Sequence, residues 1–170
     1  LAMLLYGACQ TGVATWMVRY MSHTLQAPAY APYVLSCYWI GTIVCRFLSS
    51  RSKADPKKRL ILGMLIAGVA HCIGIATKSP LAACLGTLVV GLAGGLSVPT
   101  LTHLASKNNP GHSAAATSIV GVMNFLSGVL IPLCIAALGG GVGLWAAMLL
   151  RGILAILASG VTLVLARELN

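Results

Sequence analysis

Polar side chains are rare in this sequence, and the few that interrupt its apolar runs are the ones suited to chemistry. Gln10 and Asn124 carry amides that can both donate to and accept from the hydroxyl groups of a ligand. Tyr38 and Trp39 combine an aromatic face with an O–H or N–H donor, which suits stacking on the apolar face of a ligand. The same groups can instead bond between helices or pack as ordinary aromatic residues, so both interpretations stay open here.

Charged groups inside apolar runs are also candidates, because each needs a partner or a water-filled cavity. Arg19 and Arg151 lie towards the outer ends of their runs, and we expect both side chains to extend outward to the interface. Arg151 is the deeper of the two and would suit a cavity better. Thr100 is a fifth candidate for ligand binding. His103 can titrate near neutral pH, or it can lie at the membrane interface with its hydrogen bonds made. His71 is interpreted as structural.

Motifs for catalysis and metal binding are missing from the sequence. Ser127 lacks the G-x-S-G context of an intramembrane serine protease, and there is no H-E-x-x-H metal motif. The six cysteines fall inside apolar runs without the spacing of a metal site. The only acids are Asp55 and Glu168. We therefore expect no enzyme, no metal and no cofactor, and no mid-membrane carboxylate in this chain to bind a coupling proton.

The composition indicates that lipid is the solvent around these residues. The chain of 170 residues is 58% hydrophobic and 8% charged, whereas soluble domains carry about 25% charged residues. The formal charge is +9, but six of the eleven Lys and Arg residues lie between Arg46 and Arg59. Membrane topology explains this clustering better than a nucleic-acid partner does.

Six apolar runs are long enough to cross about 30 Å of hydrocarbon as helices. They span approximately residues 1–21, 31–50, 60–77, 80–106, 113–138 and 144–166. The sequence thus predicts an all-α membrane protein with six transmembrane helices in one bundle, and the helix count allows a 3+3 inverted repeat. Gly91-x-x-x-Gly95 suits close contact between helices, and Pro99 and Pro132 are expected to kink theirs.

The stretch from Tyr38 to Arg59 sets the orientation of this bundle. It joins two apolar runs through a short basic loop, and loops rich in Lys and Arg remain in the cytoplasm. With this loop inside, the connection at 107–112 and the C-terminus are cytoplasmic as well. Arg46 can reach the interface, bond helix-end carbonyls or pair with Asp55, and we expect Arg46 and Asp55 to form a cytoplasmic gate.

The beginning of the chain suggests that it is part of something longer. Leu1 stands in place of an initiator Met, there is no signal-peptide pattern, and an apolar run starts at once. We therefore expect this N-terminus to be a cut through a longer protein.

Several short motifs occur in the order found in a known transporter family. Residues 6–10 read Y-G-A-C-Q and precede Trp16, and residues 38–46 read Y-W-I-G-T-I-V-C-R. Further along the chain come Gly91, Gly94, Pro99 and Thr100, followed by Asn124 and Pro132. Together they resemble the C-terminal half of the major facilitator superfamily, most of all the fucose–proton symporter-like sugar transporters. Gln10 stands where that family usually has Glu, and Cys45 where it has a second Gly.

The resemblance implies a two-bundle transporter in the cell membrane that works by alternating access, with its site at mid-membrane between the bundles. This chain would be the C-terminal bundle, and the N-terminal bundle would be absent from it. The cargo would be a sugar or another small polar metabolite, carried with a proton that binds in the other bundle or with no coupled ion. A multi-substrate drug exporter of the same superfamily stays open, because fold does not fix cargo. A non-transporting membrane scaffold stays open as well.

Overall fold

The computed structural model describes residues 1–51, 54–141 and 143–168, and these residues form a bundle of long helices joined by short connections. In chain order the helices are α1 (Ala2–Arg19), α2 (Ala31–Ser50), α3 (Pro56–Ala76), α4 (Pro80–Gly94), α5 (Ser97–Asn108), α6 (Ser113–Gly141) and α7 (Leu144–Glu168). A π-helical turn, η1 (Tyr20–Thr24), continues α1, and single 3₁₀ turns, η2 (Pro28–Tyr30) and η3 (Pro110–His112), precede α2 and α6.

Five of the six predicted membrane spans meet the requirements of length and hydropathy within the described residues. They are Pro28–Ser50, Pro56–Ala76, Pro80–Asn108, Pro110–Gly141 and Leu144–Ala166. The first predicted span, 1–21, does not appear among them. Its α-helical part is 18 residues long, and Gln10 and Arg19 lower its hydropathy. Six spans therefore stay a prediction, as does the 3+3 repeat.

Proline and its neighbours explain where the helices depart from the predicted bounds. Asp55 caps α3 by accepting a hydrogen bond from the backbone N–H of Lys57 at 2.9 Å, and Pro56 occupies the first turn, so α3 begins at Pro56 and not near residue 60. The run at 80–106, predicted as one helix, divides into α4 and α5 around Gly95 and Leu96. In contrast, α6 remains a single helix through Pro132.

Pro99 accounts for the division between α4 and α5. A proline has no N–H to donate to the carbonyl four residues earlier, which here belongs to Gly95. That carbonyl instead accepts a hydrogen bond from Arg46 Nε of α2 at 3.3 Å. The predicted distortion at Pro99 is thus confirmed, and the carbonyl that it frees is bonded by a neighbouring helix.

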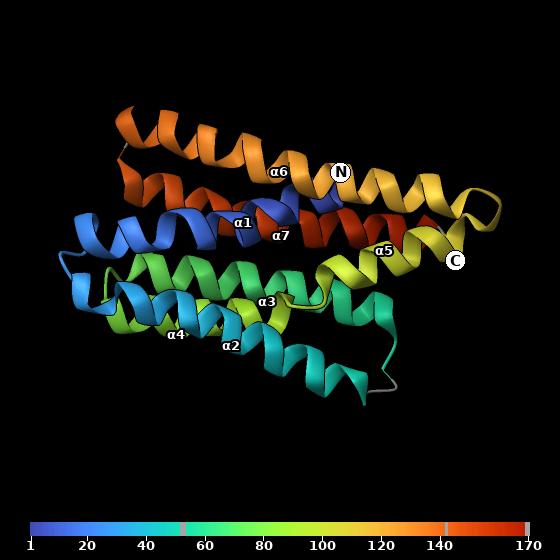
Figure 1. Ribbon diagram of the computed structural model, residues 1–170, viewed down its shortest axis with the longest axis horizontal. Coiled ribbons are helices and arrows are strands. Elements are labelled where there is room, and N and C mark those ends of the chain that lie inside the picture. Colours follow the sequence, from blue (N-terminus) through green and yellow to red (C-terminus); the bar gives the residue numbers. More distant parts are fainter. Residues whose placement is uncertain (52–53, 142, 169–170) are drawn as a thin grey trace.

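The connections alternate between two ends of the bundle, as expected (Figure 1). Helices α3 and α6, and α1 with its π-helical turn, finish at one end of the bundle, whereas α2, α5 and α7 finish at the other. In cross-section, α6 lies on one side and packs against α1, α7 and α5, while α2 and α4 lie on the opposite side with α3 between them and α7.

Small residues let several helix pairs approach closely. A Cβ at Gly41 of α2 would lie 2.5 Å from the Leu88 carbonyl oxygen of α4, and one at Gly86 of α4 would lie 2.8 Å from the Ala70 carbonyl oxygen of α3. A Cβ at Gly95 would lie 3.1 Å from Thr42 Cα of α2. The predicted role of Gly91-x-x-x-Gly95 in a helix contact is confirmed, because both glycines pack on α2.

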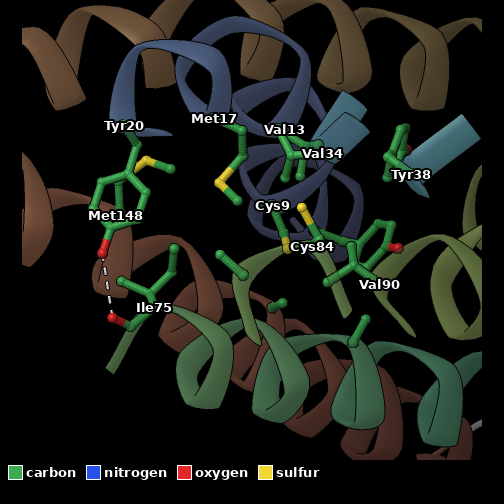
Figure 2. Packing of buried hydrophobic residues seen from close by; sticks show 14 of the residues in the cluster. Cys9, Val13, Met17, Tyr20, Val34, Tyr38, Ile75, Cys84, Val90 and Met148 are labelled. Carbon is green, nitrogen blue, oxygen red and sulfur yellow. Dashed lines mark hydrogen bonds between the residues drawn. The ribbon is translucent and has the colours of Figure 1, made fainter. Parts of the chain in front are cut away.

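The core is apolar, and so is the outer surface. Buried side chains of α1, α2, α3, α4 and α7 converge in one cluster, and the Tyr20 hydroxyl donates to the Ile75 carbonyl at 3.3 Å there (Figure 2). Large apolar side chains also cover the outside, including Ile43, Phe47, Ile73, Phe125 and Leu133. Such a surface is unfavourable in water, and the apolar spans place these side chains in contact with the lipid bilayer.

Candidate functional site

We use the name α1–α6 seam for Gln10 of α1 together with Asn124 and Ser127 of α6, which include two of the predicted ligand-binding residues. Gln10 of α1 is half-buried, and its Oε1 atom is buried without a hydrogen-bond partner among the described residues. Asn124 and Ser127 of α6 lie against Gly7, one turn before Gln10. A Cβ at Gly7 would lie 2.6 Å from Ser127 Oγ and 3.7 Å from Asn124 Oδ1.

The unpaired polar atoms of this seam are its most informative feature. Asn124 Oδ1 and Ser127 Oγ are buried and, like Gln10 Oε1, have no hydrogen-bond partner in the described part of the chain. Buried polar atoms are nearly always bonded to protein, to water or to a ligand. The α1–α6 seam can therefore accept and donate hydrogen bonds to a polar molecule that enters it.

Tyr38 and Trp39 have opposite orientations, although they are neighbours in sequence. Tyr38 is buried and its hydroxyl interacts with the Gln10 side chain, so it extends the polar seam towards α2. Trp39 is 49% exposed and packs edge-on against the Tyr38 ring, with 5.1 Å between the ring centroids. The structure thus brings Tyr38 to Gln10 and leaves Trp39 on the outer surface of α2.

Tyr6 is a residue of this region that the sequence analysis did not single out as a site. Its side chain is fully buried, its hydroxyl contacts Gly94 at the end of α4, and the Ser97 side chain lies beside it. The helical spacing of Tyr6 and Gln10, four residues apart, is the signal that could have identified it. Ser127 was considered only as a protease nucleophile, and no sequence motif marks it as a seam residue.

Thr100 and Arg46 lie apart from the seam, at the end of the bundle where α2 finishes and α3 begins. They line a cavity of about 370 Å³ between the ends of α2, α3 and α5, which we call the basic end cavity. Its polar lining residues are Arg46, Ser49, Ser50, Arg59, Thr100 and His103. The five predicted ligand-binding residues are therefore distributed over three places: the seam, the outer surface and this cavity.

Arg46 and Asp55, the predicted gate residues, each have their own partner. Arg46 Nε donates to the Gly95 carbonyl at 3.3 Å, which is the bond to a helix-end carbonyl that the sequence allowed. Asp55 accepts from the backbone N–H of Lys57 and caps α3. Arg46 therefore links α2 to the division between α4 and α5, while Asp55 fixes the start of α3.

The expectation for Arg151 was wrong. Its side chain does not extend outward, because it is fully buried in α7 with its guanidinium against Gly12 of α1. Nη2 donates to the Cys9 carbonyl at 3.0 Å, Nη1 contacts Met148 Sδ at 3.0 Å, and Nε has no partner among the described residues. The absence of a side chain at Gly12 provides the space, which helical position alone did not indicate.

Arg19 and His71 lie as the sequence predicted. Arg19 is exposed and its guanidinium lies over the Trp16 ring, 5.4 Å from the centroid. His71 is buried with Nε2 at 3.2 Å from the Met148 carbonyl oxygen, which agrees with a structural role. Within the described residues, no three His, Cys, Asp or Glu side chains gather in a way that could hold a metal ion.

Comparison with known proteins identifies the family. The family model described as the Major Facilitator Superfamily matches residues 1–169. No curated protein and no solved structure matched the chain. The family match covers nearly the whole sequence, and it agrees with the long apolar helices and with the order of motifs from Tyr6 to Pro132. The chain therefore belongs to the Major Facilitator Superfamily, and it is a multi-pass integral membrane protein of a family of solute transporters, not of enzymes.

Proposed function

We propose that this chain helps to transport a sugar or another small polar metabolite by alternating access, and that the α1–α6 seam forms one wall of the binding site. The observation that carries this proposal is the set of three buried, unpaired polar atoms on Gln10, Asn124 and Ser127. Sites that recognise hydroxyl-rich ligands need such donors and acceptors. Tyr38, beside Gln10, adds an aromatic ring and a hydroxyl to the same wall.

The proposed binding site needs a second wall, and we propose that another helical bundle supplies it as the N-terminal half of the transporter. Of the most apolar 18 residues in the Pro110–Gly141 span, 11% are buried, against 33–44% in the other four spans. This low burial leaves α6, and with it the open side of the seam, available to a partner bundle. The resemblance of residues 6–10 and 38–46 to fucose–proton symporter-like transporters supports the same arrangement.

Proton coupling, in this proposal, depends on a carboxylate in that other bundle. Asp55 caps α3 at the end of the bundle, and Gln10 stands at the position where the resembling family usually has Glu. The α1–α6 seam therefore offers amides and hydroxyls to the cargo but no group that ionises near neutral pH. Arg46, bonded to Gly95, is proposed to act as a gate by holding α2 to the α4–α5 division.

A multi-substrate exporter of the same superfamily is the second candidate, and one cavity favours it. Between α1, α3, α5, α6 and α7 lies a largely apolar cavity of about 370 Å³ lined by residues that include Met3, Leu104 and Met123. Apolar lining of this kind suits amphiphilic compounds better than sugars. The two candidates predict different cargo and different critical residues.

The test is uptake by the full-length protein in proteoliposomes, with Gln10→Ala and Asn124→Ala as variants. Each substitution removes amide donors and acceptors from the seam, so sugar uptake should fall by about tenfold, the equivalent of one hydrogen bond of about 1.4 kcal/mol. Thr15→Ala is the matched control, because Thr15 is exposed on the same helix and its hydroxyl bonds the Thr11 carbonyl of its own helix.

Membrane expression of all three variants should equal that of the wild type. Wild-type uptake in both seam variants would remove these residues from the site. Efflux of amphiphilic dyes that survives both seam substitutions but falls in Met123→Ala would favour the exporter. No transport of either class by the wild-type protein would favour a scaffold.

A further inference from the structure

The basic end cavity contains a cluster of donors, of which the transport proposal uses Arg46 alone, as a gate. Two guanidinium groups, one imidazole and three hydroxyls line it, from Arg46, Arg59, His103, Ser49, Ser50 and Thr100. They come from three different helices, α2, α3 and α5, and no acidic side chain lines the cavity within the described residues. A cavity with this lining attracts anions and repels cations.

The two guanidinium groups are held at the cavity wall by single hydrogen bonds. Arg46 Nε donates to the Gly95 carbonyl at 3.3 Å, and Arg59 Nη2 donates to Ser49 Oγ. A guanidinium has five N–H donors, so a single bond leaves each group with further donors for a molecule in the cavity. Because each bond restricts its side chain, less conformational entropy is lost when an anion binds.

The surroundings of the cavity add positive charge. Arg51 and Lys58 lie in or beside the connection that leads into α3. The Asp55 carboxylate accepts the backbone N–H of Lys57 as the helix cap, and Asp55 is not a lining residue. An anion that enters therefore meets two fixed guanidinium groups from different helices, and the carboxylate is bonded elsewhere.

We propose that the basic end cavity binds a phosphate-bearing anion. Arginine forks match phosphate oxygens in pairs, and hydroxyls of serine and threonine complete such sites. Two sources have this chemistry: the headgroup of an anionic phospholipid in the adjoining leaflet, and a free phosphate compound. In either case one phosphate would bridge α2 and α3 next to the carbonyl of Gly95. The proposal does not depend on transport, because binding alone tests it.

The experiment uses the full-length protein in lipid nanodiscs and two probes. Inorganic phosphate is titrated calorimetrically into nanodiscs of phosphatidylcholine. Separately, protein from nanodiscs that also contain phosphatidylglycerol is released in a mass spectrometer, and the retained lipids are counted. Binding of inorganic phosphate alone would identify a free phosphate compound, and retention of phosphatidylglycerol alone would identify a lipid headgroup. Each result would support the site.

The variants are Arg46→Gln with Arg59→Gln, compared with Arg51→Gln as the matched control. Arg51 lies at the same end, but its guanidinium is over the Phe47 ring, 4.9 Å from the centroid, and it does not line the cavity. The double variant should bind the successful probe at least about tenfold more weakly, because two charge-assisted contacts are lost. Arg51→Gln should bind within about twofold of the wild type, because it removes only charge that does not line the cavity and is screened by salt.

Folding of the double variant is checked by its thermal transition, because Arg46 also bonds the Gly95 carbonyl. If that variant does not fold, Arg59→Gln alone and Arg59→Lys replace it. The lysine keeps the charge without the paired donors, so its binding should lie between those of wild type and Arg59→Gln. Equal binding by the wild type and the folded variants, or no binding of either probe by the wild type, would overturn the proposal.

Discussion

Arg151 is a charged side chain in the interior of the bundle, and its identified contacts are with neutral groups. Its guanidinium bonds the Cys9 carbonyl and touches Met148 Sδ, and Nε has no partner in the described part of the chain. A buried charge without an opposite charge nearby costs several kcal/mol in desolvation. Because Gly12 makes room for the guanidinium, the contact of α1 with α7 depends on Gly12.

We predict that Arg151→Met stabilises the bundle. Methionine fills a similar volume and has no charge to desolvate, and replacement of buried ionic groups by apolar residues often stabilises by about 1–4 kcal/mol. The thermal unfolding midpoint in detergent should therefore rise. Arg151→Ala leaves a cavity and should lower that midpoint relative to Arg151→Met.

Arg19→Met is the control for this prediction, because Arg19 is exposed. This substitution should change the free energy of unfolding by no more than about 0.5 kcal/mol. A lower midpoint for Arg151→Met than for the wild type would mean that the bonds to Cys9 and Met148 outweigh the desolvation of the charge.

At the scale of elements, the division between α4 and α5 organises the contacts around it. Pro99 leaves the Gly95 carbonyl without its helical donor, Arg46 of α2 bonds that carbonyl, and Tyr6 of α1 packs on Gly94. Helices α1 and α2 thus both contact the irregular turn between α4 and α5. Non-helical backbone inside a membrane is tolerated where neighbouring helices satisfy it.

We predict that Pro99→Ala restores a continuous helix across this division. The alanine supplies the missing N–H, so the Gly95 carbonyl would regain a helical bond and Arg46 would lose its place there. Hydrogen exchange of the amides at 96–100 should slow by at least about tenfold, as one bond of about 1.4 kcal/mol implies. The same substitution should also weaken phosphate binding in the basic end cavity.

Pro80→Ala is the matched control, since Pro80 is the first residue of α4, where a proline replaces no helical bond. Its exchange at 96–100 should equal that of the wild type. Unchanged exchange in Pro99→Ala as well would show that the glycines, and not the proline, divide the helix.

For the whole molecule, the alternation of connections between two ends determines which segments share a side of the membrane. The end of α2, the start of α3, the turn before α6 and the end of α7 lie at one end, and residues 25–27 lie at the other (Figure 1). Most of the basic residues of the sequence fall between Arg46 and Arg59, where α2 ends and α3 begins, and short basic loops stay in the cytoplasm.

We predict that reporters fused after the C-terminus or inserted at 109–112 are active in the cytoplasm, whereas one inserted at 25–27 is active outside. The physical cause is the cost of moving a cluster of Lys and Arg across the bilayer. The first two fusions serve as a check on each other, because the fold places them at the same end. A cytoplasmic signal from 25–27 together with outside signals from the other two would reverse the orientation.

Local features of the sequence were sufficient to predict much of the fold. The bounds of α2 were predicted at 31–50, and the apolar runs gave α6 and α7 to within a few residues, because hydropathy and length depend on consecutive residues. Asp55 followed by Pro56 is a helix-start signal that explains why α3 begins earlier than the apolar run. Pro99 likewise marked the distortion between α4 and α5.

The tertiary structure alone decided which polar groups meet. That Tyr38 turns inward to Gln10 while Trp39 stays outside depends on the close contact of α2 with Gly91, and Arg151 is buried because Gly12 lies on another helix. Asn124, Ser127 and Gly7 come together only through the packing of α6 on α1. A sequence determines by itself which segments enter the membrane, because lipid acts on each segment separately. The partner of a side chain depends on how two helices are rotated and how they cross. Contacts between residues far apart in the sequence determine both.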